Sequence, residues 1–200
     1  MSALLMLDAG VANAQLDARE APNVSGPLIH TGGSCDAGRE RAGGQVVVVL
    51  RACSDVYGFK AGKETDPNRD YEVIWLQTSV EPRNGFCATD VTSTLKVPKG
   101  TRIERKAPRY KRTDERIRYK TRLVARAGGS AVRRGVVKQK FGLLPRVLDP
   151  TVRGRTFTLE WRGRTSKALG FAMGVEISYP ENNPPGTQPQ GNVNASLRSC

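Results

Sequence analysis

The chain contains a single histidine, His30, and no two cysteines at C-x-x-C spacing. Nucleophilic catalysis of the Ser-His-Asp or Cys-His type needs a histidine that packed neighbours hold in place. His30 instead lies in a segment without hydrophobic periodicity. A zinc site needs clustered Cys and His ligands, and the sequence has neither a Gly-rich phosphate loop nor a nucleophile elbow. We therefore expect a protein that is not an enzyme, with no metal site and no cofactor.

Long apolar runs are also missing, since no segment approaches the roughly 20 apolar residues of a membrane-spanning helix. A short apolar run occupies residues 3–7, and Ala12-Asn13-Ala14 follows it with the small-x-small pattern that precedes a signal cleavage point. We interpret residues 1–14 as the remnant of an export signal, with Gln15 as the first mature residue. The predicted location is therefore secreted or cell surface.

Cysteine is scarce but even in number, with four residues: Cys35, Cys53, Cys87 and Cys200. In an exported chain this count favours two disulfide bonds. Four cysteines allow three connectivities, and the sequence does not choose among them. Our expectation is that Cys53 pairs with Cys87 inside a sheet and that Cys35 pairs with Cys200 near the chain ends.

Acidic residues are few where the basic residues are most concentrated. The net charge is +13, and residues 102–146 carry 16 Lys or Arg against Glu104, Asp114 and Glu115, which equals the whole excess. Such a local concentration of one sign is typical of a surface that contacts an anionic partner. The alternative is a solvated face whose charge serves solubility.

Residues 116–123 alternate strictly between cationic and other side chains. Successive side chains of a β-strand point to opposite faces, so the pattern predicts a strand with one cationic face. Gly128-Gly129 then predicts a turn into a second basic strand over residues 131–141. The predicted anion-binding residues on this hairpin are Arg116, Arg118, Lys120, Arg122, Arg133, Arg134, Lys138 and Lys140.

Other segments also show the period or composition of strands. They cover residues 45–53, 71–80, 87–97, 157–161 and 171–179, and Asn84-Gly85 signals a hairpin turn between the second and third of them. About seven strands without a convincing helix predict an all-β fold, specifically an antiparallel two-sheet sandwich. The placement of Cys53, Trp75 and Cys87 resembles immunoglobulin domains in this loose architectural sense, without implying membership of that family.

The domain organisation follows from composition. Residues 45–180 are predicted to form a single β-sandwich domain, preceded by a loose lead-in over residues 15–44 with a short strand at 27–30. Residues 181–200 are polar and rich in Pro, Asn and Gly, so they are expected to form a disordered tail.

Three weaker patterns each have a simple structural explanation. Asp66-Pro67-Asn68-Arg69-Asp70 begins like a calcium loop but lacks its later ligands, which favours an Asx-rich turn before a strand. Glu160 and Glu176 could form the carboxylate pair that glycoside cleavage needs, although both are explained equally well as solvated carboxylates on strands. An Arg-Gly-Arg-Thr sequence occurs at residues 153–156 and again at 162–165, and it could contact a phosphate or sulfate, although glycine as a turn residue is sufficient to explain both copies.

The leading functional hypothesis is an exported, non-enzymatic β-sandwich that binds an anionic polymer or surface through residues 102–146. Candidate partners are wall polymers, acidic polysaccharides and lipid headgroups. One alternative is a structural or assembly subunit of an envelope layer or shell, which would self-associate through a sheet edge. The other is a nucleic-acid-binding protein, because Tyr110 and Tyr119 lie among the cations.

Overall fold

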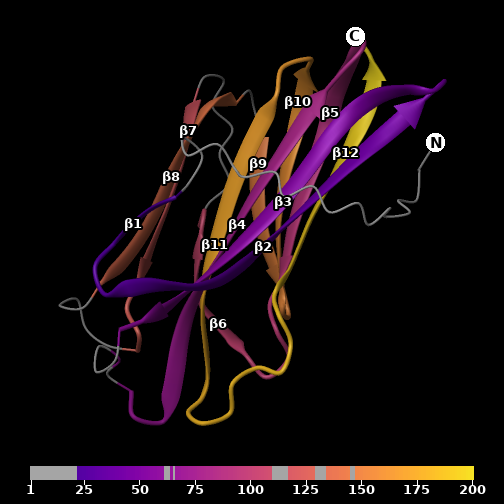
Figure 1. The fold of residues 1–200 in the computed structure, drawn as a ribbon. Helices are drawn as coiled ribbons and strands as arrows, with labels where there is room; N and C mark the ends of the chain where they lie inside the picture. Colours follow the sequence, from indigo (N-terminus) through magenta and orange to yellow (C-terminus); the bar gives the residue numbers. More distant parts are fainter. Residues whose placement is uncertain (1–21, 61–63, 65, 110–116, 129–133, 145–146) are drawn as a thin grey trace.

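In the computed structural model the chain is all-β, with twelve strands in three antiparallel sheets (Figure 1). The structure describes residues 22–60, 64, 66–109, 117–128, 134–144 and 147–200, and it describes 117–120, 139–144 and 147–148 by their backbone alone. These ranges contain no helix. Accordingly, no helix long and apolar enough to cross a membrane occurs in the described part of the chain.

A five-stranded sheet forms the middle layer. Its order is β2 (Leu28–Ala42), β3 (Gln45–Phe59), β4 (Arg69–Pro82), β11 (Leu169–Pro180) and β6 (Arg102–Ala107). Strands β4 and β11 are buried along most of their length on both faces. Such double-sided burial explains why apolar residues occur at consecutive positions in these two strands rather than at every second one.

A four-stranded sheet covers one face of the middle layer. Its order is β12 (Gln190–Ser199), β5 (Phe86–Lys96), β10 (Thr156–Thr165) and β9 (Val147–Arg153). The larger core lies between the two sheets, where Phe157 and Trp161 of β10 pack with Ile74, Leu76 and Phe171 of the middle sheet. Phe157, Leu159 and Trp161 are all buried, which places the apolar side of the strand predicted over residues 157–161 in the core.

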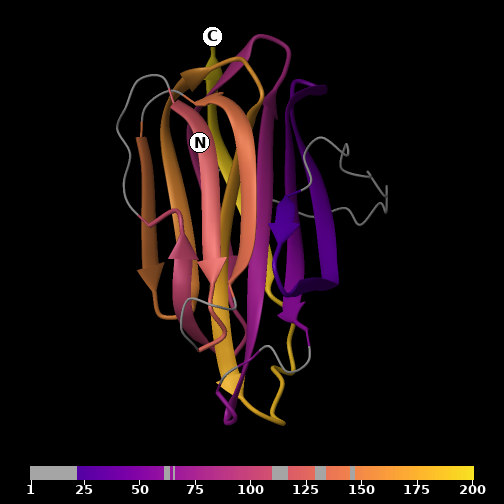
Figure 2. The same ribbon diagram turned by 90° about the vertical axis from the view of Figure 1, so that its left-hand side faces the viewer.

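A three-stranded sheet covers the opposite face, with the order β1 (Asn23–Ser25), β8 (Gly135–Leu144) and β7 (Ile117–Ala125). Figure 2 shows the β7–β8 pair turned toward the viewer, in front of the middle sheet. The smaller core packs Leu123 and Val137 against Val73 and Trp75. Gly174 stands opposite Trp75, and a Cβ there would lie 2.4 Å from the indole ring, so only glycine leaves room for it.

The all-β prediction is confirmed, but the predicted number of about seven strands was wrong. Twelve strands form three sheets, and an immunoglobulin-like two-sheet sandwich is not confirmed. Five short or polar strands carry no clear alternation of apolar residues, because they lie at sheet edges or pair through their backbones. These strands are β1, β2, β6, β9 and β12.

Two segments that we expected to be loose or disordered are strands. Within the predicted lead-in, β2 pairs along its length with β3, and within the predicted tail, β12 pairs with β5 from Gln190 to Ser199. Their side chains are mostly exposed, and Val193 is the one fully buried residue of β12. The amino-acid composition of these segments therefore did not predict strands. They are ordered because their backbones pair with a buried neighbouring strand.

The Asn84-Gly85 turn has the predicted local geometry but a different role. Both residues have positive φ angles, 51° and 79°, and the Phe86 N–H donates to the Arg83 carbonyl. However, β4 pairs with β3 and β11, whereas β5 pairs with β10 and β12. The turn thus carries the chain from the middle sheet to the four-stranded sheet, and the predicted hairpin between the two strands was wrong.

All four cysteines form disulfides, as predicted, but the expected pairing was wrong. Cys35 bonds Cys53 across β2 and β3, and Cys87 bonds Cys200 beside the end of β12. The Cys200 N–H also donates to the Gly85 carbonyl. Each bond therefore joins neighbouring strands of one sheet, which linear spacing could not reveal because the pairs are 18 and 113 residues apart.

The two disulfides are expected to differ in how much they stabilise the fold. In the chain-entropy model, closing 113 residues stabilises by about 5 kcal/mol and closing 18 residues by about 3 kcal/mol. Replacing Cys87 and Cys200 by Ala should therefore lower the unfolding free energy more than replacing Cys35 and Cys53. Urea titrations of both double variants test this, and the reverse order would contradict it.

Candidate anion-binding surface

The predicted basic strand exists as β7, and its alternation is confirmed where side chains are described. Thr121 and Leu123 are buried against the middle sheet, and the Thr121 hydroxyl donates to the Ala172 carbonyl at 3.0 Å. Arg122, between them, is exposed. The alternation therefore holds one face of the three-stranded sheet in the core and presents the other face to solvent.

Strand β8 is the antiparallel partner of β7, and the register places cations opposite cations. Arg122 pairs with Lys138, and Lys120 pairs with Lys140. Like charges directly opposite each other on neighbouring strands are destabilising. The register nevertheless brings cationic positions of the two strands next to each other.

The structure describes some of the predicted anion-binding residues with their side chains, some by their backbone alone and some not at all. Arg122, Arg134 and Lys138 are exposed, and no ion pair joins them to a carboxylate of the described residues. Arg118, Lys120 and Lys140 lie on β7 and β8, where only the backbone is described. Arg116 and Arg133 lie outside the described residues. The structure thus gives the hairpin scaffold and three of its cationic side chains.

A second group of cations, which was not among the eight predicted anion-binding side chains, lines a surface groove of about 750 Å³. The groove lies between β6 and the turn from β9 to β10. One carboxylate, Glu104, accompanies five cations in its lining: Arg102, Arg105, Lys106, Arg109 and Arg155. We call these five residues the basic groove. Arg155 belongs to the Arg-Gly-Arg segment that was considered for phosphate or sulfate contact.

Several cations of the basic groove are held by identifiable contacts. Lys106 lies with its Nζ 5.7 Å from the centroid of the buried Phe157 ring, and Arg155 donates to the Val97 carbonyl at 3.2 Å. Arg102 approaches the Glu104 carboxylate at 3.7 Å but remains 75% exposed. Cation–π and backbone contacts hold a positive group without neutralising it. The groove therefore keeps most of its charge available to a ligand.

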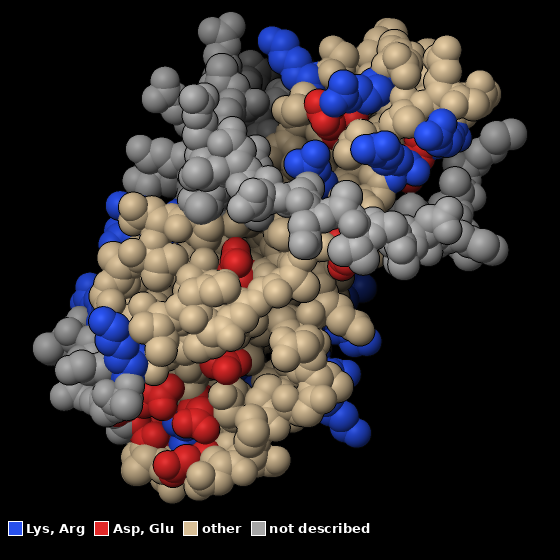
Figure 3. Space-filling view, viewed as in Figure 1, with Lys and Arg blue, Asp and Glu red and all other residues tan. Residues whose placement is uncertain are grey.

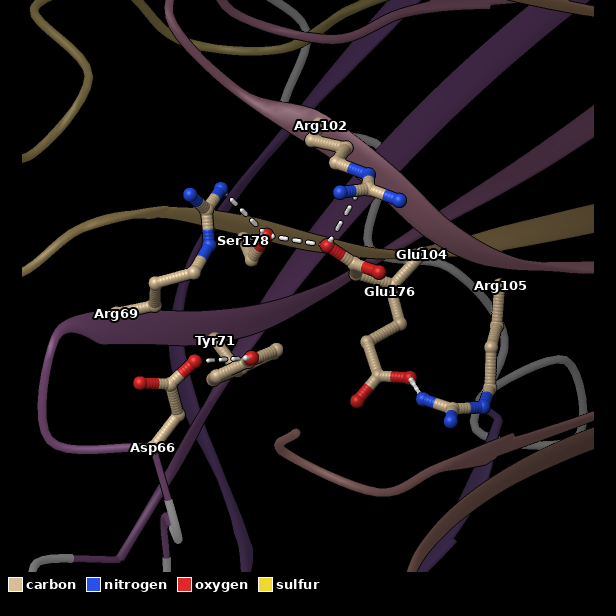
Figure 4. A network of polar contacts seen from close by, with 8 residues as sticks. All are labelled: Asp66, Arg69, Tyr71, Arg102, Glu104, Arg105, Glu176 and Ser178. Atoms are coloured by element: carbon tan, nitrogen blue, oxygen red, sulfur yellow. Dashed lines mark hydrogen bonds and ion pairs between the residues drawn. The ribbon is translucent and has the colours of Figure 1, made fainter. Parts of the chain in front are cut away.

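Arg105 is the exception, because it pairs with the buried Glu176 (Figure 4). Its Nη1 lies 2.5 Å from Glu176 Oε2, while Glu176 Oε1 accepts the N–H groups of Arg126 and Ala127 at 2.7 Å each. The Glu176 side chain is fully buried, so the interpretation of this residue as a solvated strand carboxylate was wrong. It ties β11, β6 and the end of β7 together.

A cluster of acidic side chains lies at the end of the molecule where β4 begins (Figure 3), and it includes Glu64, Asp66, Asp70 and Glu72. Burial raises the pKa of Glu64, and the nearby charge of Asp70 raises it further. Burial likewise raises the pKa of Glu72, against a hydrogen bond from the Tyr179 hydroxyl that lowers it. A raised pKa means that folding disfavours the ionised form, so the ionised Glu64 and Glu72 lower the stability of the fold.

Neighbouring polar contacts organise the same end of the sheet. Burial and the hydrogen bond to Asp66 raise the pKa of Tyr71 to about 12. Arg69 donates to the Ser178 hydroxyl, which in turn donates to Glu104 at 2.6 Å (Figure 4). The chain of contacts links the start of β4 to β11 and β6, and it leads from the acidic end to the basic groove.

The segment that resembled the start of a calcium loop is a turn. The Asn68 N–H donates to Asp66 Oδ1 at 3.0 Å, which is the Asx-turn geometry that its composition favoured. Among the residues that the structure describes, no group of three or more His, Cys, Asp or Glu side chains is placed to hold a metal ion. The segment therefore starts β4 rather than building a site.

His30 does not lie in a loose lead-in, as the sequence suggested, but on β2. Its Nε2 is 3.1 Å from Asp55 Oδ1, and Gln77 donates to Asp55 Oδ2 at 3.3 Å. These side chains line a shallow groove of about 430 Å³ beside β1. The pairing of β2 with β3 brings His30 next to Asp55, and no local sequence pattern predicts this contact.

Comparisons with protein-family models, with curated proteins and with solved structures found no match for this chain. The function must therefore be argued from the geometry of its own surface.

Removing the charge of Glu176 should destabilise the fold. Glu176→Gln removes the buried counter-charge of Arg105 and replaces the carboxylate that accepts two N–H groups by a neutral, weaker acceptor, so we expect a loss of about 3 kcal/mol of unfolding free energy. Urea titration measures the loss, and hydrogen exchange should show faster exchange at the Arg126 and Ala127 amides. The half-exposed Glu160 provides the control, since Glu160→Gln should change neither quantity.

Neutralising the acidic end should stabilise the protein in a pH-dependent way. A carboxyl whose pKa is raised on folding contributes stability below its unfolded pKa, and this contribution is lost as pH rises through the folded value. Replacing Glu64 and Glu72 by Gln should therefore raise the unfolding midpoint at pH 7 and leave it unchanged near pH 3.

The exposed Glu181 serves as the matched control for this pair. Thermal unfolding of Glu181→Gln should show no gain at either pH. An equal gain of the double variant at both pH values would show that ionisation is not the cause.

Proposed function

We propose that this protein is an exported, non-enzymatic binder of an anionic polymer or surface, which it contacts through residues 102–146. One observation carries the proposal: the exposed cations of β7 and β8, and most of those in the basic groove, lack neutralising carboxylates among the described residues. The exceptions are Arg102 and Arg105, which pair with Glu104 and Glu176.

The electrostatics support a polymeric rather than a single small partner. A surface that concentrates charge of one sign produces a potential of several kT and raises the local concentration of anions. The cations lie on two separate supports, a strand pair and a groove between two sheets. An extended chain of phosphate, sulfate or carboxylate groups would contact both supports, and each added contact would release a counterion.

The described aromatic side chains favour recognition of anionic groups over stacking with bases. No Phe, Tyr or Trp of the described side chains is exposed, and most of them lie in the two cores. Single-stranded nucleic acids are usually bound by exposed aromatic rings on which successive bases stack. Tyr110 and Tyr119, on which the nucleic-acid alternative was based, lie outside the described side chains. The described side chains of the basic surface supply charge without an aromatic platform, which favours wall polymers, acidic polysaccharides and lipid headgroups.

Export remains part of the proposal, and the disulfides support it. Two disulfides and no free cysteine among the described residues are compatible with an extracellular location. Disulfides persist in oxidising compartments and are rare in the cytosol. The expected signal remnant at residues 1–14 lies outside the described residues.

Replacing four exposed cations of the proposed surface should weaken binding and its dependence on salt. The variant carries Ser at Arg109, Arg122, Arg134 and Lys138, and its affinity for polyphosphate and heparin is measured from 50 to 300 mM NaCl. If all four contact the polymer, the slope of log K against log salt should fall by about 3.

A matched variant loses the same charge elsewhere, at the exposed residues Arg51, Lys60, Lys167 and Arg198. It should keep nearly the affinity and slope of the unmodified protein. Equal losses in the two variants would show that only net charge matters and would refute a defined surface. Tighter binding to single-stranded DNA than to either polymer would favour the nucleic-acid alternative.

A further inference from the structure

Strand β2 is an outer edge of the middle sheet over its full 15 residues (Figure 1). At about 3.4 Å per residue it presents an edge roughly 50 Å long. Its side chains from Ile29 to Ala42 are exposed or half-exposed, so the strand is covered on neither face. Exposed edges of this length can pair with another strand, and proteins usually protect them.

The disulfide shows which backbone groups face outward. Cys35 and Cys53 are directly opposite, with their Cα atoms 4.0 Å apart, which is the short spacing of a non-hydrogen-bonded antiparallel pair. In such a pair the N–H and C=O of each residue point away from the partner strand. The backbone groups of Cys35, and by alternation those of Gly33 and Ala37, therefore point to the open edge.

The centre of β2 carries only part of the usual protection of an edge strand, since Asp36, Arg39 and Glu40 are charged but the strand has neither Pro nor Lys there. Register shifts occur at His30/Gly32 and Glu40/Arg41, and the run between them is regular. Most side chains of that run are small. By comparison, edge strand β6 has six residues and four charged side chains, and edge strand β9 contains Pro150.

The charge of β2 favours a second copy of this chain as the partner. Asp36 and Glu40 balance Arg39 and Arg41 on the strand, although the whole chain carries +13. Two copies joined at β2 would keep their basic surfaces apart, because β2 and β6 lie at opposite edges of the sheet. In a two-fold symmetric interface both partners contribute the same surface. Two β2 strands that pair antiparallel meet this condition, because each presents the same outward backbone N–H and C=O groups.

From these observations we propose that the protein forms a two-fold symmetric dimer by antiparallel pairing of β2 with β2 of a second copy. The two middle sheets then form one continuous ten-stranded sheet. The dimer is independent of the proposed anion binding, but it would place two basic surfaces on one particle. Binding to a long polymer would then gain from the linked sites.

The test removes one outward N–H. Ala37→Pro deletes a donor that faces the open edge and leaves the bonds to β3 intact, because proline is tolerated in an edge strand where its nitrogen faces solvent. Sedimentation equilibrium between 1 and 200 µM should show a dimer for the unmodified protein. The dissociation constant should rise at least tenfold for Ala37→Pro and remain unchanged for the matched control Ala37→Ser.

Hydrogen exchange on the unmodified protein provides a second measurement if the proline variant fails to fold. The amides of Gly33, Cys35 and Ala37 should be protected at 200 µM and should lose that protection on dilution to 1 µM. A monomer throughout the concentration range, or a dimer in which these amides exchange freely, would overturn the proposal. Neither result would affect the anion-binding proposal, which is measured on immobilised polymer at low protein concentration.

Discussion

The ion pair between Glu176 and Arg105 is the contact on which the arrangement of the basic surface depends. The Glu176 carboxylate lies on β11, pairs with a cation of β6 and accepts two N–H groups from the end of β7. The same side chain thus fixes the edge of the basic groove and one end of the basic strand. A buried ion pair adds little net stability compared with apolar packing, but here it specifies how two sheets meet.

The double-sided burial of the middle sheet explains why the cations must lie outside. Strands β4 and β11 bury both faces, one in the larger core around Phe157 and Trp161 and the other in the smaller core around Trp75. The three-stranded sheet contributes one apolar face to the smaller core, so Arg122 and Lys138, the cations of its strands whose side chains are described, are left in solvent. Because successive side chains of a strand point to opposite faces, cations at alternate positions in the sequence lie on the same face of the sheet.

Much of the fold could be predicted where one face of a strand is buried and the other is solvated. The alternation at Thr121, Arg122 and Leu123 gave the correct orientation because it depends only on local geometry. Edge strands β2 and β12 gave no such signal, because they pair through their backbones and bury few side chains. Their existence depends on neighbours that are distant in the sequence.

The candidate site shows the same division. The basic hairpin was predicted from residues adjacent in the chain, whereas the basic groove combines β6 with a turn about 50 residues later. In the sequence, Glu176 alternates with apolar residues, which suggests that its face of the strand is solvated. In the structure the three-stranded sheet covers that face, and the Glu176 side chain is buried. The disulfide pairing was likewise set by strand order, which the positions of four cysteines do not contain.

The position of the exposed cations on one sheet also determines how the molecule would approach a charged layer. Arg122 and Lys138 are exposed on the outer side of the three-stranded sheet, while the inner side of that sheet is buried in the smaller core. A negatively charged plane would attract this outer side. Copies adsorbed through it would share one orientation, with the four-stranded sheet directed away from the plane.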